Sequence, residues 1–255
     1  MNNHLSLCRL LYGSLLACLS TGLLLAEDNV APPGFTALFN GRDLTGWKVP
    51  EGDNGHWKVV DGVIDYDARS EAKTDKNLWT DRPYGDYTLL VDWRIKETPY
   101  LNPRVPYLLP DGSEAKDIAG KPFQMTLPDS DSGILLRGDA KYQINIWCWP
   151  AGSGEMYGVR RDQSLPAEVR AGVTPRRQAD RPVGQWNRYE ITAKGGMIRV
   201  KLNDQVVLPG VTIPGIPAQG PIGLQHHGSM GKDGKWNGPP SLMQFKNIFI
   251  KADPS

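Results

Sequence analysis

The segment QINIWCWP, residues 143–150, combines side chains that suit sugar binding. In a β-strand the side chains alternate between two faces, so this segment would gather amides and indoles on one face. Sugar C–H faces stack on indoles, and sugar hydroxyls pair with amides. The other face, with Ile144, Ile146 and Cys148, would join a core. A half-buried sheet covered by a loop is the alternative. The predicted binding residues are Gln143, Asn145, Trp147 and Trp149.

Two further segments supply charged groups. Arg137 ends GILLR, where alternation sets it on the face of Gly133 and Leu135, and a guanidinium there could stabilise developing negative charge. Glu155 follows a glycine-rich turn after the aromatic strand and could be a general acid or base beside the indoles. Tyr157 would share its face, as a hydrogen-bonding partner. The alternatives are a solvent-facing arginine and a solvated turn carboxylate.

The segment GLQHHG divides in the same way. Leu224 and His226 would face the apolar side, and Gln225 and His227 the polar side. Neighbouring histidines on a strand therefore cannot jointly bind one metal ion in ordinary geometry. His227 could move protons near neutral pH, although an isolated histidine is also a common structural residue.

Other chemistry has less support. Asp129 and Asp131 in PDSDSG, and the pair in DYD at 65–67, lack the remaining spacing of a calcium loop, so calcium is a possibility without a defined site. The E-x-D-x-x-E strand of retaining jelly-roll glucanases is missing, as are G-x-S-x-G, H-E-x-x-H and nucleotide-binding loops. The ordinary hydrolytic templates therefore do not apply.

The first 26 of the 255 residues differ from the rest. Arg9 precedes an apolar stretch without acidic residues, which predicts a signal peptide cleaved after Ala26 and an exported protein, periplasmic or extracellular. A retained membrane anchor and a lipoprotein signal ending at Cys18 are the alternatives. Without Arg9, 28 basic residues balance 28 acidic ones, since the whole chain has 29 and 28. This balance gives no electrostatic case for nucleic acid or an anionic membrane as partner.

Residues 27–255 are expected to form one domain held together by a hydrophobic core. Cys148 is the single cysteine in this range, so no internal disulfide can form, and its strand position favours a buried thiol over a nucleophile. Short alternating runs separated by Gly, Pro, Asn and Asp predict an all-β jelly-roll sandwich of two antiparallel sheets. Asn203 and Asp204 predict a two-residue hairpin turn. Residues 98–130 and 162–184 are expected to be long ordered loops.

Seven segments in order resemble the 3-keto-disaccharide hydrolase family. Each motif is loose alone, but together they span nearly all of the mature chain. They are GFTALFNGRDLTGW at 34–47, WKVVDGVI at 57–64, DSGILLRG at 131–138, GSGEMYG at 152–158, GQWNRYEI at 184–191, GPIGLQHHG at 220–228 and MQFKNIFIK at 243–251.

The resemblance implies a concanavalin A-like jelly roll that acts on glycosides already oxidised to a ketone at C3. The ketone acidifies the neighbouring C2–H, so a base can remove that proton, the enolate can expel the C1 substituent, and water can add afterwards. Such a site needs a base and a donor for the enolate oxygen. Arg137, Glu155 and His227 have suitable types.

Family positions can be carried over residue by residue, with one departure. Relatives commonly have Glu-x-Gln where this chain has Gln143 and Asn145, so an amide replaces an acid. Glu155, where relatives often have a small residue, could be a relocated carboxylate. The other positions carried over from the family's motifs are Asp131, where many relatives have Asn, and Arg137, Tyr157, Gln225 and His227.

Two functions follow. The first is an enzyme that cleaves 3-keto-glycosides by elimination and hydration, with Glu155 or His227 as base and Arg137 as electrostatic stabiliser. The second is a non-catalytic, lectin-like module that binds carbohydrate through its indoles and amides.

Overall fold

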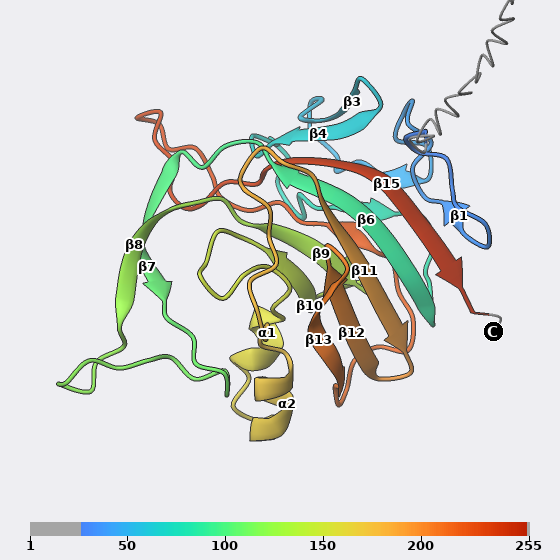
Figure 1. The fold of residues 1–255 in the computed structure, drawn as a ribbon. Coiled ribbons are helices and arrows are strands. Elements are labelled where there is room, and N and C mark those ends of the chain that lie inside the picture. The colour runs from blue at the N-terminus through green and yellow to red at the C-terminus, as the bar shows by residue number, and fades with distance from the viewer. Residues whose placement is uncertain (1–26, 254–255) are drawn as a thin grey trace, which may run out of the picture.

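The computed structural model describes residues 27–253, which form a β-sandwich with an arm projecting from it (Figure 1). The predicted signal peptide lies outside these residues. Among the described residues, no helix is both long enough and apolar enough to cross a membrane.

The larger sheet is antiparallel and has eight strands. Its strand order is β13-β12-β11-β6-β15-β4-β3, and β1 pairs with β15. The bounds are β1 Thr36–Ala37, β3 Trp57–Val60, β4 Val63–Asp67, β6 Tyr87–Ile95, β11 Asn187–Lys194, β12 Met197–Leu202, β13 Gln205–Thr212 and β15 Leu242–Ala252.

The smaller sheet has five antiparallel strands in the order β10-β9-β14-β5-β2, and a separate two-stranded sheet, β7-β8, forms the arm. Two short helices follow β10 in the chain. The bounds are β2 Trp47–Lys48, β5 Leu78–Thr80, β7 Tyr100–Pro106, β8 Gln124–Asp129, β9 Ser132–Leu136, β10 Asp139–Ile146, β14 Gly223–Leu224, α1 Tyr157–Arg160 and α2 Ala167–Gly172.

The core lies between the two main sheets. On β6, alternate residues from Tyr87 to Ile95 are buried, and on β10 the side chains of Ile144 and Ile146 join the same cluster. Cys148 packs against this cluster as a free thiol, and burial raises its pKa to about 12. The predicted all-β sandwich of two antiparallel sheets is confirmed.

Two hairpin turns are formed by residues with positive φ. Asn203 and Asp204 have φ of 51° and 65° and connect β12 to β13, as predicted. Arg137 and Gly138 have φ of 54° and 78° and connect β9 to β10. Because both residues of such a turn need positive φ, the strand alternation ends before Arg137.

The two expected loops have different outcomes. The prediction of a long ordered loop over residues 98–130 is wrong, because β7 and β8 pair as strands across this segment. Its prolines are accommodated because a two-stranded arm has free edges, where a missing N–H costs little. Residues 162–184 contain only the short helix α2 as regular structure, so the prediction of a long loop is confirmed for most of this segment.

Candidate active site

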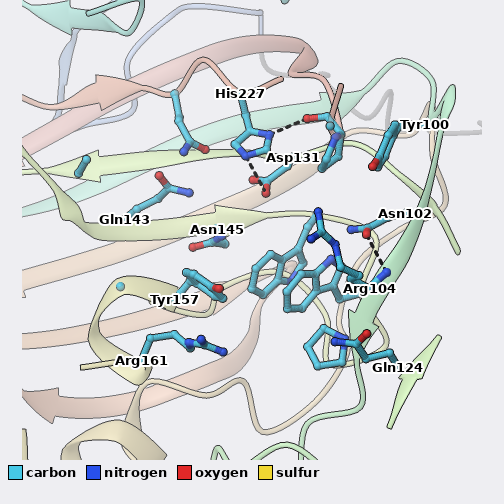
Figure 2. A pocket seen from close by; sticks show the side chains of 18 of the residues that line it. Tyr100, Asn102, Arg104, Gln124, Asp131, Gln143, Asn145, Tyr157, Arg161 and His227 are labelled. Carbon is cyan, nitrogen blue, oxygen red and sulfur yellow. Dashed lines mark hydrogen bonds and ion pairs between the residues drawn. The ribbon is translucent and has the colours of Figure 1, made fainter. Parts of the chain in front are cut away.

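A pocket of about 660 Å³ lies between the smaller sheet, the β7-β8 arm and α1 (Figure 2). It collects most of the residues that the sequence singled out. The predicted residues that line it are Asp131, Gln143, Asn145, Trp147, Trp149, Tyr157, Gln225 and His227.

Strand alternation on β10 positions the amides as expected. Gln143 and Asn145 line the pocket, whereas Ile144 lies in the core. Gly133, which pairs with Asn145, gives Gln143 its space, because a Cβ on Gly133 would lie 2.5 Å from Gln143 Cγ. The smaller sheet therefore presents two neutral amides to the pocket.

The two tryptophans line the pocket, but they do not form a two-ring platform. Trp147 and Trp149 stack on each other, with ring centroids 3.8 Å apart and planes within 5°. Trp147 is only 3% exposed, and its Nε1 donates to the Gly152 carbonyl at 2.8 Å. Tyr157 meets both indoles edge-on at 6.3 Å. Of the two indoles, Trp149 is therefore the one on which a sugar can stack.

Asp129 fixes the base of the arm against these indoles. Its carboxylate accepts hydrogen bonds from Asn102 Nδ2 at 2.8 Å, Trp149 Nε1 at 3.1 Å and the backbone N–H groups of Ser130 and Cys148. A calcium ion at Asp129 would have to displace these donors. Within residues 27–253, no three His, Cys, Asp or Glu side chains gather as metal ligands would.

His227 and Asp131 face each other across the pocket wall (Figure 2). His227 Nδ1 lies 2.7 Å from the Pro239 carbonyl, which can only accept, so Nδ1 carries a proton. In the neutral ring this leaves Nε2 free to accept a proton, and Nε2 lies 3.9 Å from Asp131 Oδ2. The backbone N–H of His227 donates to Ser241 Oγ, which fixes the segment.

Asp131 is an unusual carboxyl group. Its side chain is 15% exposed, and Oδ1 is buried without a hydrogen-bond partner among the described residues. Burial raises the pKa of Asp131 to about 7, a shift that nearby Asp129 increases and His227 opposes. A carboxyl that titrates near neutrality beside an imidazole can share one proton with it.

The two adjacent histidines separate as predicted. His226 Nδ1 lies 2.6 Å from the Tyr66 hydroxyl, and burial lowers the pKa of His226 to about 4. Gln225, like His227, lines the pocket, while Leu224 is in the core. Alternation thus assigned all four side chains correctly.

Arg137 lies outside the pocket, so the prediction that it stabilises charge there is wrong. Its guanidinium is buried and donates to the carbonyls of Gly85, Gly195 and Pro217 and to Asp86 Oδ1 at 2.9 Å. The positive φ of the β9-β10 turn takes Arg137 off the strand face assumed for it. Arg137 therefore links several loops by hydrogen bonds.

Glu155 is also outside the pocket, so its predicted place beside the indole face is wrong. The residue is fully buried, and its carboxylate accepts a hydrogen bond from Arg160 Nε. Tyr157 begins α1, so the i, i+2 rule of a strand does not relate Glu155 to Tyr157. Burial raises the pKa of Glu155 to about 7, against the effect of Arg160.

The sequence reasoning missed the residues that the arm contributes. Period-two spacing within YLNPRVP was the available signal, because alternate positions of β7 face the pocket. The missed polar residues of the arm and its connecting segment are Tyr100, Asn102, Arg104, Glu114 and Gln124; Arg161, after α1, and Asn237, before β15, are also missed.

The sequence matches the model of one protein family. The 3-keto-alpha-glucoside-1,2-lyase-like domain matches residues 34–251, which is most of the chain. The chain belongs to this family. The resemblance seen in the ordered motifs is thereby confirmed.

Solved structures similar to this family member support the fold. A crystal structure of a "putative glycosyl hydrolase" from Parabacteroides distasonis ATCC 8503 at 1.70 Å resolution is 20% identical, with a TM-score of 0.56, over 89% of this chain and 100% of that one. A second from the same organism, at 2.13 Å, is 20% identical with a TM-score of 0.53, over 88% of this chain and 85% of that one. No curated protein matches the sequence.

In this 3-keto-alpha-glucoside-1,2-lyase-like domain, Asp131→Asn should increase stability at high pH. The folded pKa of Asp131 is raised, so its contribution to stability is full below the unfolded pKa of about 4 and is lost as pH rises through about 7. We expect the variant to gain about 2 kcal/mol of unfolding free energy at pH 8 and little at pH 4, by urea denaturation. Asp81→Asn, at an exposed position, is the control. An equal gain at both pH values would contradict this assignment.

Glu155→Gln tests the buried pair. Gln keeps an acceptor but removes the charge that compensates Arg160, so we expect a loss of about 2–4 kcal/mol in unfolding free energy. Turnover by the folded fraction should stay within about fivefold of wild type, since Glu155 does not reach the pocket. A loss above a hundredfold with unchanged stability would instead make Glu155 part of the reaction.

Proposed function

We propose that this pocket binds a 3-keto-glycoside and cleaves it by elimination across C1 and C2, with the Asp131–His227 pair as acid and base. The observation that carries the proposal is the orientation of His227. Its Nδ1–H is held by the Pro239 carbonyl, so Nε2 is the basic nitrogen, and it lies beside a carboxyl whose pKa is raised by burial. The family's description as 1,2-lyase-like supports elimination across C1 and C2 as the way the bond is cleaved.

The proposed reaction proceeds through an enolate. His227 Nε2 takes the proton from C2, and the C2–H electron pair moves into the C2–C3 bond as O3 becomes an oxyanion. When the C3 carbonyl reforms, a C1–C2 double bond forms and the C1–O bond breaks. The leaving oxygen receives a proton from the Asp131–His227 pair. The product is an unsaturated 3-keto sugar, and water added across C1 and C2 converts it to the free 3-keto sugar.

Neutral amides suit the enolate step. Gln143, Asn145 and Gln225 line the same pocket as the acid–base pair. Their N–H groups can donate to O3, and a buried donor stabilises developing charge more strongly than water does. The amides at 143 and 145 thus serve as donors, and the base function lies with Asp131 and His227.

Carbohydrate binding without catalysis is the second candidate. The observation that favours it is the pair of amides at positions 143 and 145, which can bind sugar hydroxyls, together with the half-buried Trp149. Neither feature requires an acid or a base.

The test incubates the protein with a 3-keto-disaccharide and with its unoxidised parent. We expect release of the C1 substituent from the keto form alone, and exchange of the C2 proton with deuterated solvent. Binding of both sugars without release or exchange would support the binding module instead. A run with added chelator reports whether a divalent metal contributes.

We also propose that the protein acts after export, in the periplasm or outside the cell. The support is the N-terminal sequence pattern of residues 1–26. Cell fractionation with the leader present and deleted tests this.

A further inference from the structure

The pocket has a reactive side and an arm side. Figure 2 shows His227, Asp131 and Gln143 on one side of the pocket and Gln124 on the other, and the Arg104 side chain extends from the arm toward the middle of the pocket. At about 660 Å³ the pocket is larger than a single hexose ring requires, so a second unit has room beside the first. If the ring that reacts lies against Asp131 and His227, its C1 substituent extends toward the arm.

All but one of the charged residues that line the pocket lie near a side chain of opposite charge. Glu114 lies 3.0 Å from Arg161 Nη1 and 3.7 Å from Arg160 Nη1, and Arg160 also pairs with Glu155. These two acids and two arginines balance. Asp131 and His227 balance when they share one proton. The remaining charged group is Arg104.

Arg104 is available to a ligand. It is exposed, and among residues 27–253 its guanidinium has neither an acidic partner nor a hydrogen bond; only its backbone N–H is engaged, by Asn102 Oδ1. It lines the pocket together with Gln124, which pairs with Pro106, two residues further along β7. The Gln124 side chain likewise forms no hydrogen bond with the described residues. The arm thus offers a cation and an adjacent amide.

We propose that the unit released from C1 carries a carboxylate, as a hexuronic acid does, and that Arg104 binds it. The planar guanidinium matches a carboxylate with two parallel hydrogen bonds, and Gln124 can donate a third. Trp149, at the base of the arm, supplies an apolar surface for the same ring. This proposal rests on the proposed function for the position of C1, and it adds the chemical class of the leaving group.

The experiment compares two matched sugars, 3-keto-glucosyl-glucuronic acid and 3-keto-glucosyl-glucose with the same linkage. Binding is measured by calorimetry and turnover by release of the second unit. We expect about 5- to 20-fold tighter binding of the uronate at low salt, decreasing as salt screens the charge. Arg104→Gln should abolish this preference, and Arg104→Lys should keep part of it, because lysine keeps the charge but loses the planar fork.

Lys121→Gln is the matched control, since Lys121 is an exposed cation on the same arm outside the pocket lining. It should leave the preference unchanged. Equal affinity of wild-type protein for both sugars, or a preference that survives Arg104→Gln, overturns the proposal. A uronate preference in binding that is lost in Arg104→Gln, without release of either sugar, would keep Arg104 as a carboxylate-binding residue and refute the elimination reaction, so the two failures are distinguishable.

Discussion

His227→Ala should lower kcat on a 3-keto-disaccharide by about 10³-fold, within the range that a positioned general base contributes. The reason is the fixed proton on Nδ1, which leaves Nε2 as the nitrogen that can remove the C2 proton. Neither amide on β10 can replace it, because an amide is not basic near neutral pH. Substrate binding should change much less than kcat, since Trp149 and the amides remain.

His56→Ala is the matched control. His56 also faces a carboxylate, with Nδ1 2.9 Å from Asp67 Oδ1, but neither residue lines the pocket. Its kcat should equal that of wild type. Deuterium exchange at C2 gives a second measurement, because it reports proton removal even where release is slow. If His227→Ala still exchanges the C2 proton at the wild-type rate, His227 is not the base.

Arg137→Met should lower the unfolding free energy by about 3–5 kcal/mol while kcat of the folded protein stays within about threefold. The substitution removes every donor that the guanidinium supplies to the carbonyls of Gly85, Gly195 and Pro217. Methionine fills similar space, so the cost comes mainly from unpaired buried carbonyls.

Urea denaturation and steady-state kinetics on the same samples measure both quantities. Arg82→Met, at an exposed arginine outside the pocket lining, should change stability by less than about 0.5 kcal/mol. If Arg137→Met lost kcat without losing stability, Arg137 would have a role in the reaction. That outcome would contradict its position in the fold.

Local alternation was enough to predict most of the sandwich and much of the pocket. On β10, and from Leu224 to His227, the two-residue alternation of a strand assigned each side chain correctly. Asn203 and Asp204 formed a hairpin turn because their types tolerate positive φ. These features depend on a few neighbouring residues, which a sequence displays directly.

The errors have two physical causes. The two-residue alternation of a strand was applied to Arg137, although a turn with positive φ begins at that residue. It was also applied from Glu155 to Tyr157, although α1 begins at Tyr157. The stacking of Trp147 on Trp149 depends on their side-chain conformations and on Asp129, which strand geometry alone does not give. The first two errors are thus local changes of backbone conformation, and tertiary contacts decide the third.

The arm has a consequence for how this family can diversify. Its two strands hydrogen-bond to each other and lie outside both main sheets, so inward positions such as Arg104 and Gln124 can be exchanged without repacking the sandwich. The groups proposed to break the bond stand on the other wall. Evolution can therefore retune which molecules are accepted while inheriting the reaction unchanged.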